Sequence, residues 1–102
     1  MFNFKNKAIA NKIRNDPYYR FQSLTEIEIA AKLGIKIDVN QASVRGWLRL
    51  PGISIHQAKV VLKLVRRGFH LVCIEDIAAT INLPVTRLLP LEPILYLSLI
   101  HI

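Results

Sequence analysis

The sequence predicts an all-α fold of about five short helices. Three observations carry this prediction. A serine followed three residues later by a glutamate, Ser23 and Glu26, is typical of a helix start. Apolar residues recur at helical spacing after Ser54, and glycine follows the expected end of a helix at Gly34 and again at Gly68. With 102 residues and 52% hydrophobic composition, the chain can build one small packed domain.

We divide the chain after residue 22. Residues 1–22 are a basic N-terminal arm or a loose helix, which Asn15-Asp16-Pro17 would end. Residues 17–21 are an extended aromatic connector, whose rings we expect to pack over the core rather than to stack on bases. Residues 23–102 form a single domain with an apolar C-terminal tail.

The first helix of this domain begins with a capping box. Ser23 can accept a hydrogen bond from the amide of Glu26, whose carboxylate would reach back to the amide of Ser23. Gly34 can end the helix in the left-handed conformation. Residues 35–39 are then a short extended passage.

A turn between two helices is the central feature of the chain. A helix over residues 44–50 leads into Pro51-Gly52, where proline restricts the preceding residue and glycine allows the positive φ of a sharp reversal. Ser54 can cap the helix that follows. One face of that helix is apolar and consists of Ala58, Val61, Leu62 and Val65. Another face, within an arc of about 100°, is basic and consists of His56, Lys59, Lys63, Arg66 and Arg67.

Two further helices complete the domain. Cys73 is at the cap position before a helix over residues 74–81, and a turn at residues 82–84 leads into a short helix over residues 85–89. Residues 91–102 are strongly apolar. We expect this tail to pack on the domain or on a second copy of the chain, which would make a homodimer.

The charge of the chain is unevenly distributed. Lys and Arg number 14 against 7 Asp and Glu, which gives a formal net charge of +7. The segment 45–67 contains Arg45, Arg49, Lys59, Lys63, Arg66 and Arg67 and no acidic residue. A small basic protein favours a polyanionic partner such as nucleic acid. No stretch approaches the roughly 20 apolar residues that span a bilayer, and no signal-peptide core is present, so we expect a cytoplasmic protein.

No sequence signal points to catalysis or to a bound metal. The single cysteine, Cys73, excludes an intrachain disulfide and a cysteine-rich zinc site. His56, His70 and His101 share no metal-ligand spacing, and no glycine-rich phosphate loop or nucleophile motif occurs. We expect neither an enzyme nor a cofactor.

Two sets of residues carry a resemblance to a known family. An apolar helix, a turn and a helix with a small residue at Ala58 resemble the helix-hairpin-helix motif, through the stretch Leu48-Arg49-Leu50-Pro51-Gly52-Ile53. The flanks are similar to the soluble domain of ComEA-type competence DNA receptors, through Asp38-Val39-Asn40-Gln41-Ala42-Ser43 and Gly68-Phe69-His70-Leu71-Val72-Cys73-Ile74-Glu75-Asp76-Ile77. The resemblance implies a tandem helix-hairpin-helix (SAM-like) domain that binds the DNA backbone without reading sequence.

The resemblance also implies a detailed chemistry at the hairpin. The amides of Gly52 and Ser54 would meet a phosphate, and a monovalent cation could bind the carbonyls of Leu48, Leu50 and Ile53. With the basic helix, this predicts a site for double-stranded DNA whose members are Arg49, Gly52, Ile53, Ser54, His56, Lys59, Lys63, Arg66 and Arg67.

A rival prediction is a structural or protein-interaction domain that keeps the fold without DNA binding. The small extrinsic subunit of photosystem II resembles ComEA in this way. Ser54, Asn82 and Pro84 replace glycines of the family pattern and favour this rival. Proline in particular has no N–H to donate to a phosphate, so we expect the second hairpin to be structural.

Overall fold

The computed structural model describes residues 4–97. In chain order its elements are α1 (Phe4–Asn15), α2 (Leu24–Lys32), β1 (Ile37–Asp38), α3 (Val44–Trp47), α4 (Ile55–Arg66), α5 (Ile74–Ile81), α6 (Val85–Leu88), the 3₁₀ helix η1 (Leu89–Ile94) and β2 (Leu95–Tyr96). Residues 1–3 of the predicted arm and 98–102 of the predicted tail lie outside the described residues. The described fold is mostly helical, as the sequence predicts, with one small sheet in addition.

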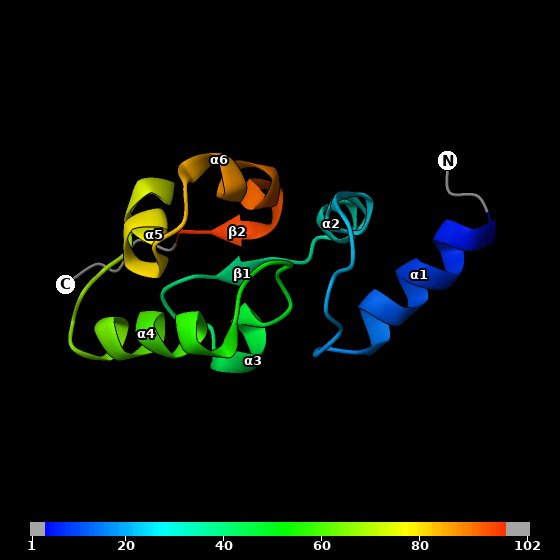
Figure 1. Ribbon diagram of the computed structural model, residues 1–102. Helices are drawn as coiled ribbons and strands as arrows, with labels where there is room; N and C mark the ends of the chain where they lie inside the picture. The colour runs from blue at the N-terminus through cyan, green and yellow to red at the C-terminus, as the bar shows by residue number, and fades with distance from the viewer. Residues whose placement is uncertain (1–3, 98–102) are drawn as a thin grey trace.

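The elements are spread along an elongated molecule of 44 × 28 × 20 Å (Figure 1). The helix α1 lies at one end and α2 beside it. The pair α3–α4 and the pair α5–α6 lie towards the other end, on opposite sides of the two strands (Figure 1). The basic helix α4 and the N-terminal helix α1 are therefore at opposite ends of the protein.

The small sheet joins segments from the two ends of the domain. β1 and β2 run parallel, with Ile37 opposite Leu95 and Asp38 opposite Tyr96. We predicted an extended passage at residues 35–39 but no partner strand for it. The pairing was hidden because each strand has only two residues and shows no alternating pattern. Residues 91 and 94 are buried beside it, so the described part of the apolar tail packs on its own domain.

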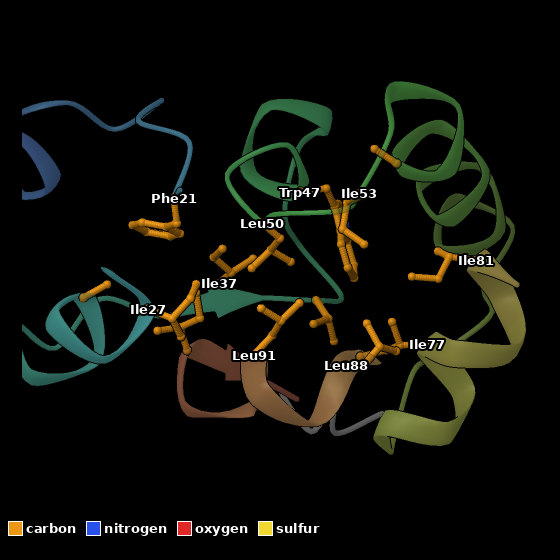
Figure 2. Packing of buried hydrophobic residues seen from close by; sticks show 14 of the residues in the cluster. Phe21, Ile27, Ile37, Trp47, Leu50, Ile53, Ile77, Ile81, Leu88 and Leu91 are labelled. Atoms are coloured by element: carbon orange, nitrogen blue, oxygen red, sulfur yellow. The ribbon is translucent and has the colours of Figure 1, made fainter. Parts of the chain in front are cut away.

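A single hydrophobic core connects the elements (Figure 2). Trp47 and Ile53, which flank the α3–α4 turn, are fully buried, and so is Leu50 between them. In Figure 2 the side chains of Ile77 and Leu88, from α5 and α6, approach this cluster from the opposite side. The apolar residues therefore anchor the turn in the core, while Gly52 at its tip is exposed.

Three helices end in the same way. Gly34, Gly68 and Asn82 follow α2, α4 and α5, and their φ angles of 78°, 95° and 58° place all three in the left-handed region. In each case the next amide donates back to a carbonyl of the preceding helix over 3.0 Å, in the bonds Ile35 to Ala30, Phe69 to Leu64 and Leu83 to Ala78. The helix ends predicted at Gly34 and Gly68 are confirmed. Asn82 substitutes for glycine because its short polar side chain tolerates this conformation.

The start of α2 differs from the prediction in one bond. The hydroxyl of Ser23 accepts from the amide of Glu26 over 3.3 Å, as expected. The carboxylate of Glu26 instead accepts from the amide of Gln22 and from the hydroxyl of Tyr19, both over 2.9 Å. The prediction that it bonds the amide of Ser23 was therefore wrong, because the connector supplies a nearer partner.

The N-terminal segment packs on the domain. Residues 4–15 form a helix, which was one of our two alternatives, and α1 buries Ala10 and Ile13 and lies against α2. The connector after it is divided between two environments. Phe21 is a core residue, whereas Tyr18 is 60% exposed and lies under the guanidinium of Arg45, whose Cζ is 4.7 Å from the ring centre.

Candidate nucleic-acid interface

The turn between α3 and α4 is short and requires glycine at one position. Gly52 has a φ of 84°. A Cβ built there would meet nothing within 4 Å, so conformation rather than space requires the glycine. The amide of Ile53 donates to the carbonyl of Leu50 over 3.4 Å and closes the turn. Ile53 thus contributes a buried anchor to the site and not an exposed side chain.

Ser54 caps α4 in a complete capping box. Its hydroxyl accepts from the amide of Gln57 over 3.1 Å, and its own amide donates to the Gln57 side-chain oxygen over 2.9 Å. The amide that the resemblance assigns to a phosphate is therefore already engaged. Among residues 4–97, the amides of Gly52, Ile55 and His56 have no hydrogen-bond acceptor. An anion at this turn would meet these three N–H groups and the positive end of the helix dipole.

The helix α4 has the two faces that the sequence predicts. Ala58 and Val61 are fully buried, and Leu62 and Val65 are partly buried. Every basic residue of the predicted arc is exposed, namely His56, Lys59, Lys63, Arg66 and Arg67. Four of them, Lys59, Lys63, Arg66 and Arg67, line an open hollow of about 560 Å³ together with Val44 and Leu62. These cations are exposed, so an anionic partner can reach them from solvent.

Arg49, which we predicted to be a member of the DNA site, is almost fully buried. It is only 9% exposed. Its Nε donates to the carbonyl of Tyr19 over 3.0 Å, its Cζ lies 4.9 Å from the ring centre of Phe21, and its buried Nη2 has no partner within the described residues. Burial lowers the pKa of Arg49, against the opposing effect of the Asp16 carboxylate. Arg49 is removed from the candidate site because the connector, distant in sequence, covers it.

Arg20 bonds the hairpin, and the sequence analysis missed this contact. Its Nη1 donates to the carbonyl of Leu48 over 2.8 Å, and its Nη2 donates to the carbonyl of Ile53 over 3.0 Å. These are two of the three carbonyls at which the resemblance implies a monovalent cation. A guanidinium of the chain itself bonds them here. No local sequence signal indicates this contact, because Arg20 precedes Leu48 by 28 residues.

Arg87 is a second residue that the sequence analysis missed. It lines a hollow between the two helical pairs together with Gly52, Ser54, His56 and Asn82. It also lines a neighbouring, more apolar hollow with Gly52 and Leu24. We expected a purely structural second hairpin, and its Pro84 does supply no N–H at the start of α6. The basic side chain of Arg87 nevertheless borders the turn of the first hairpin.

The two helical pairs are tied together beside this hollow. Nε2 of Gln57 donates to the carbonyl of Ile81 over 3.0 Å, which links the start of α4 to the end of α5. Gln57 therefore holds both the capping box and the contact between the pairs. This bond adds to the core packing that joins the two pairs beside Arg87.

Comparison with protein-family models, with curated proteins and with solved structures finds no match. The candidate site consequently rests on the geometry above. Within residues 4–97, no group of three or more His, Cys, Asp or Glu side chains is arranged to hold a metal ion. No helix in that range combines the length and apolarity that crossing a bilayer requires.

Proposed function

We propose that the chain is a sequence-independent DNA-binding module that grips the phosphate backbone of duplex DNA through the α3–α4 hairpin. One observation supports this most directly. The helix that begins at the unpaired amides of Gly52, Ile55 and His56 also presents its basic face to solvent. Backbone N–H groups at a helix start and a row of cations along the same helix both bind phosphate.

The dimensions of α4 suit a duplex. From His56 to Arg67 the helix axis rises by about 16 Å. Duplex DNA carries one negative charge per about 1.7 Å of its axis, so several phosphates face a helix of this length. Phosphate contacts fix position without reporting the base sequence, and this supports a module without sequence preference.

The expected salt dependence follows from the cations that remain in the site. With Arg49 removed from the site, the exposed Lys and Arg residues on α4 and at its C-terminal cap are Lys59, Lys63, Arg66 and Arg67. Four phosphate contacts correspond to a slope of log affinity against log salt of about −4. A salt slope near zero would mean that binding releases no counterions. It would contradict phosphate contacts by the basic face of α4.

Fluorescence anisotropy of a labelled duplex across a salt series tests the proposal. The double variant Lys59→Glu, Lys63→Glu should abolish measurable binding, because it changes the net charge of the basic face from positive to neutral. Lys7→Glu, Lys12→Glu is the matched control, with the same charge change on exposed residues of α1, at the other end of the molecule (Figure 1). It should stay within about threefold of the unaltered chain at 0.15 M salt, where screening acts within about 8 Å. Equal losses in both variants would refute a site on α4.

A second candidate is a structural or protein-interaction domain that keeps this fold without DNA binding. The observation that favours it is the amide of Ser54, which Gln57 already occupies. Absence of binding by the folded, unaltered chain at low salt would select this candidate. The search would then turn to protein partners.

A further inference from the structure

Arg20 is held against the hairpin by both of its terminal nitrogens. The two carbonyl acceptors, on Leu48 and Ile53, belong to the chain reversal on either side of Gly52. The guanidinium is planar, so two bonds from one fork restrict its orientation as well as its position. Arg20 nevertheless remains exposed. It is therefore a fixed cation at the surface rather than a freely moving one.

The backbone that carries Arg20 is fixed as well. The amide of Phe21 donates to the carbonyl of Arg49 over 2.8 Å, and Nε of Arg49 donates to the carbonyl of Tyr19 over 3.0 Å. Phe21 itself is 1% exposed. Bonds on both sides of Arg20 thus attach the connector to the hairpin.

The guanidinium changes the charge that an approaching anion would meet. The carbonyl oxygens of Leu48 and Ile53 carry partial negative charge and would repel a phosphate oxygen at the turn. Arg20 bonds both oxygens and adds a full positive charge at the carbonyls on either side of Gly52. A guanidinium has more N–H donors than these two bonds use, so donors remain for a phosphate.

We propose that Arg20 is a phosphate-binding residue of the hairpin, supplied from outside the hairpin by the connector. This inference rests on the proposed function, and it extends the binding surface from α4 across the turn to residues 17–21. In this arrangement one backbone phosphate lies between the Arg20 guanidinium and the amides at the start of α4. The positive charge at the turn is therefore supplied by a side chain of the protein itself.

The test compares Arg20→Gln with Lys7→Gln, since each removes one positive charge from an exposed side chain. With the anisotropy assay on a duplex of unrelated sequence, Arg20→Gln should weaken binding about tenfold, the size of one charge-assisted hydrogen bond. Its salt slope should become about 0.9 less steep, because one phosphate contact is lost. Lys7→Gln should leave both values within error of the unaltered chain.

Arg20→Lys separates binding from a purely structural role. Lysine keeps the charge but cannot bond two carbonyls with a planar fork, so we expect an unchanged slope and an affinity between those of the unaltered chain and Arg20→Gln. If the role of Arg20 is purely structural, its substitutions should lower the stability in urea and leave the salt slope unchanged. This result would overturn the inference. If the unaltered chain binds steeply and Arg20→Gln binds equally well, the inference fails and the proposed function stands. If the unaltered chain does not bind, both fail.

Discussion

The side chain of Asn40 forms two hydrogen bonds with the backbone of Leu71. Nδ2 donates to the carbonyl over 2.9 Å, and Oδ1 accepts from the amide over 2.8 Å. Both residues are buried, so this amide substitutes for a strand partner between the segment after β1 and the segment before α5. The contact links the segment that leads into α3 to the segment that leads into α5.

We expect Asn40→Ala to lower the free energy of unfolding by about 2 to 3 kcal/mol, because it leaves a buried amide and a buried carbonyl of Leu71 without partners. Urea unfolding followed by circular dichroism measures this. The exposed neighbour Gln41 supplies the control, since Gln41→Ala should change the stability by less than about 0.5 kcal/mol. Similar values for the two variants would show that the Asn40 contact does not stabilise the fold.

Substitutions of the buried Arg49 and the exposed Lys59 should have different effects on stability and on DNA binding. We expect Arg49→Met to lower the stability by about 1 kcal/mol, since it removes the bond to Tyr19 and the contact over Phe21, and to leave the salt slope of DNA binding unchanged. Lys59→Met removes the same charge from an exposed position, so it should make the slope about 0.9 less steep without a loss of stability. A reduced slope in Arg49→Met would return Arg49 to the binding surface.

Gln57 is expected to oppose phosphate binding while it stabilises the fold. Gln57→Ala frees the amide of Ser54 and should tighten DNA binding by about threefold or more, at a loss of about 1 to 2 kcal/mol in stability. Gln57→Glu keeps an acceptor for that amide but adds negative charge at the turn, so it should weaken binding. If Gln57→Ala loses stability at unchanged affinity, the Ser54 amide takes no part in binding.

Tyr19 gives the stability a defined dependence on pH. Burial raises the pKa of the Tyr19 phenol above its usual 10.0, and its hydrogen bond to the Glu26 carboxylate acts in the same direction. The neutral phenol is therefore favoured in the folded state. Its contribution is fully present below pH 10.0 and is lost as the pH rises through the folded-state pKa. Urea unfolding of the unaltered chain and of Tyr19→Phe should show a stability difference that shrinks above that pH; a constant difference would contradict this.

Local features of the fold could be predicted from the sequence. The ends of α2 and α4 are marked by Gly34 and Gly68, because glycine adopts positive φ without strain. The cap of α4 is marked by Ser54, and its two faces follow from the helical period. Each of these signals depends on residues within a few positions of one another, which is why it can be read without a structure.

The features that the sequence did not reveal depend on contacts between distant segments. The prediction of Arg49 as a DNA contact did not anticipate that the connector residues Tyr19 and Phe21 cover it. Arg20 shows the reverse, since it looks like any basic residue of an arm until the fold places it on the hairpin carbonyls. Basic side chains show no periodicity when they lie on separate elements, so only the fold shows which of them share a surface.

The most direct measurement is an NMR titration of the ¹⁵N-labelled chain with a short DNA duplex of arbitrary sequence at low salt. If the hairpin grips the phosphate backbone, the largest shifts should occur at the amides of Gly52, Ile55 and His56, and a second duplex of different sequence should shift the same signals. Shifts confined to α1 or to the segment around β2, or no shifts from a folded chain, would contradict the central claim.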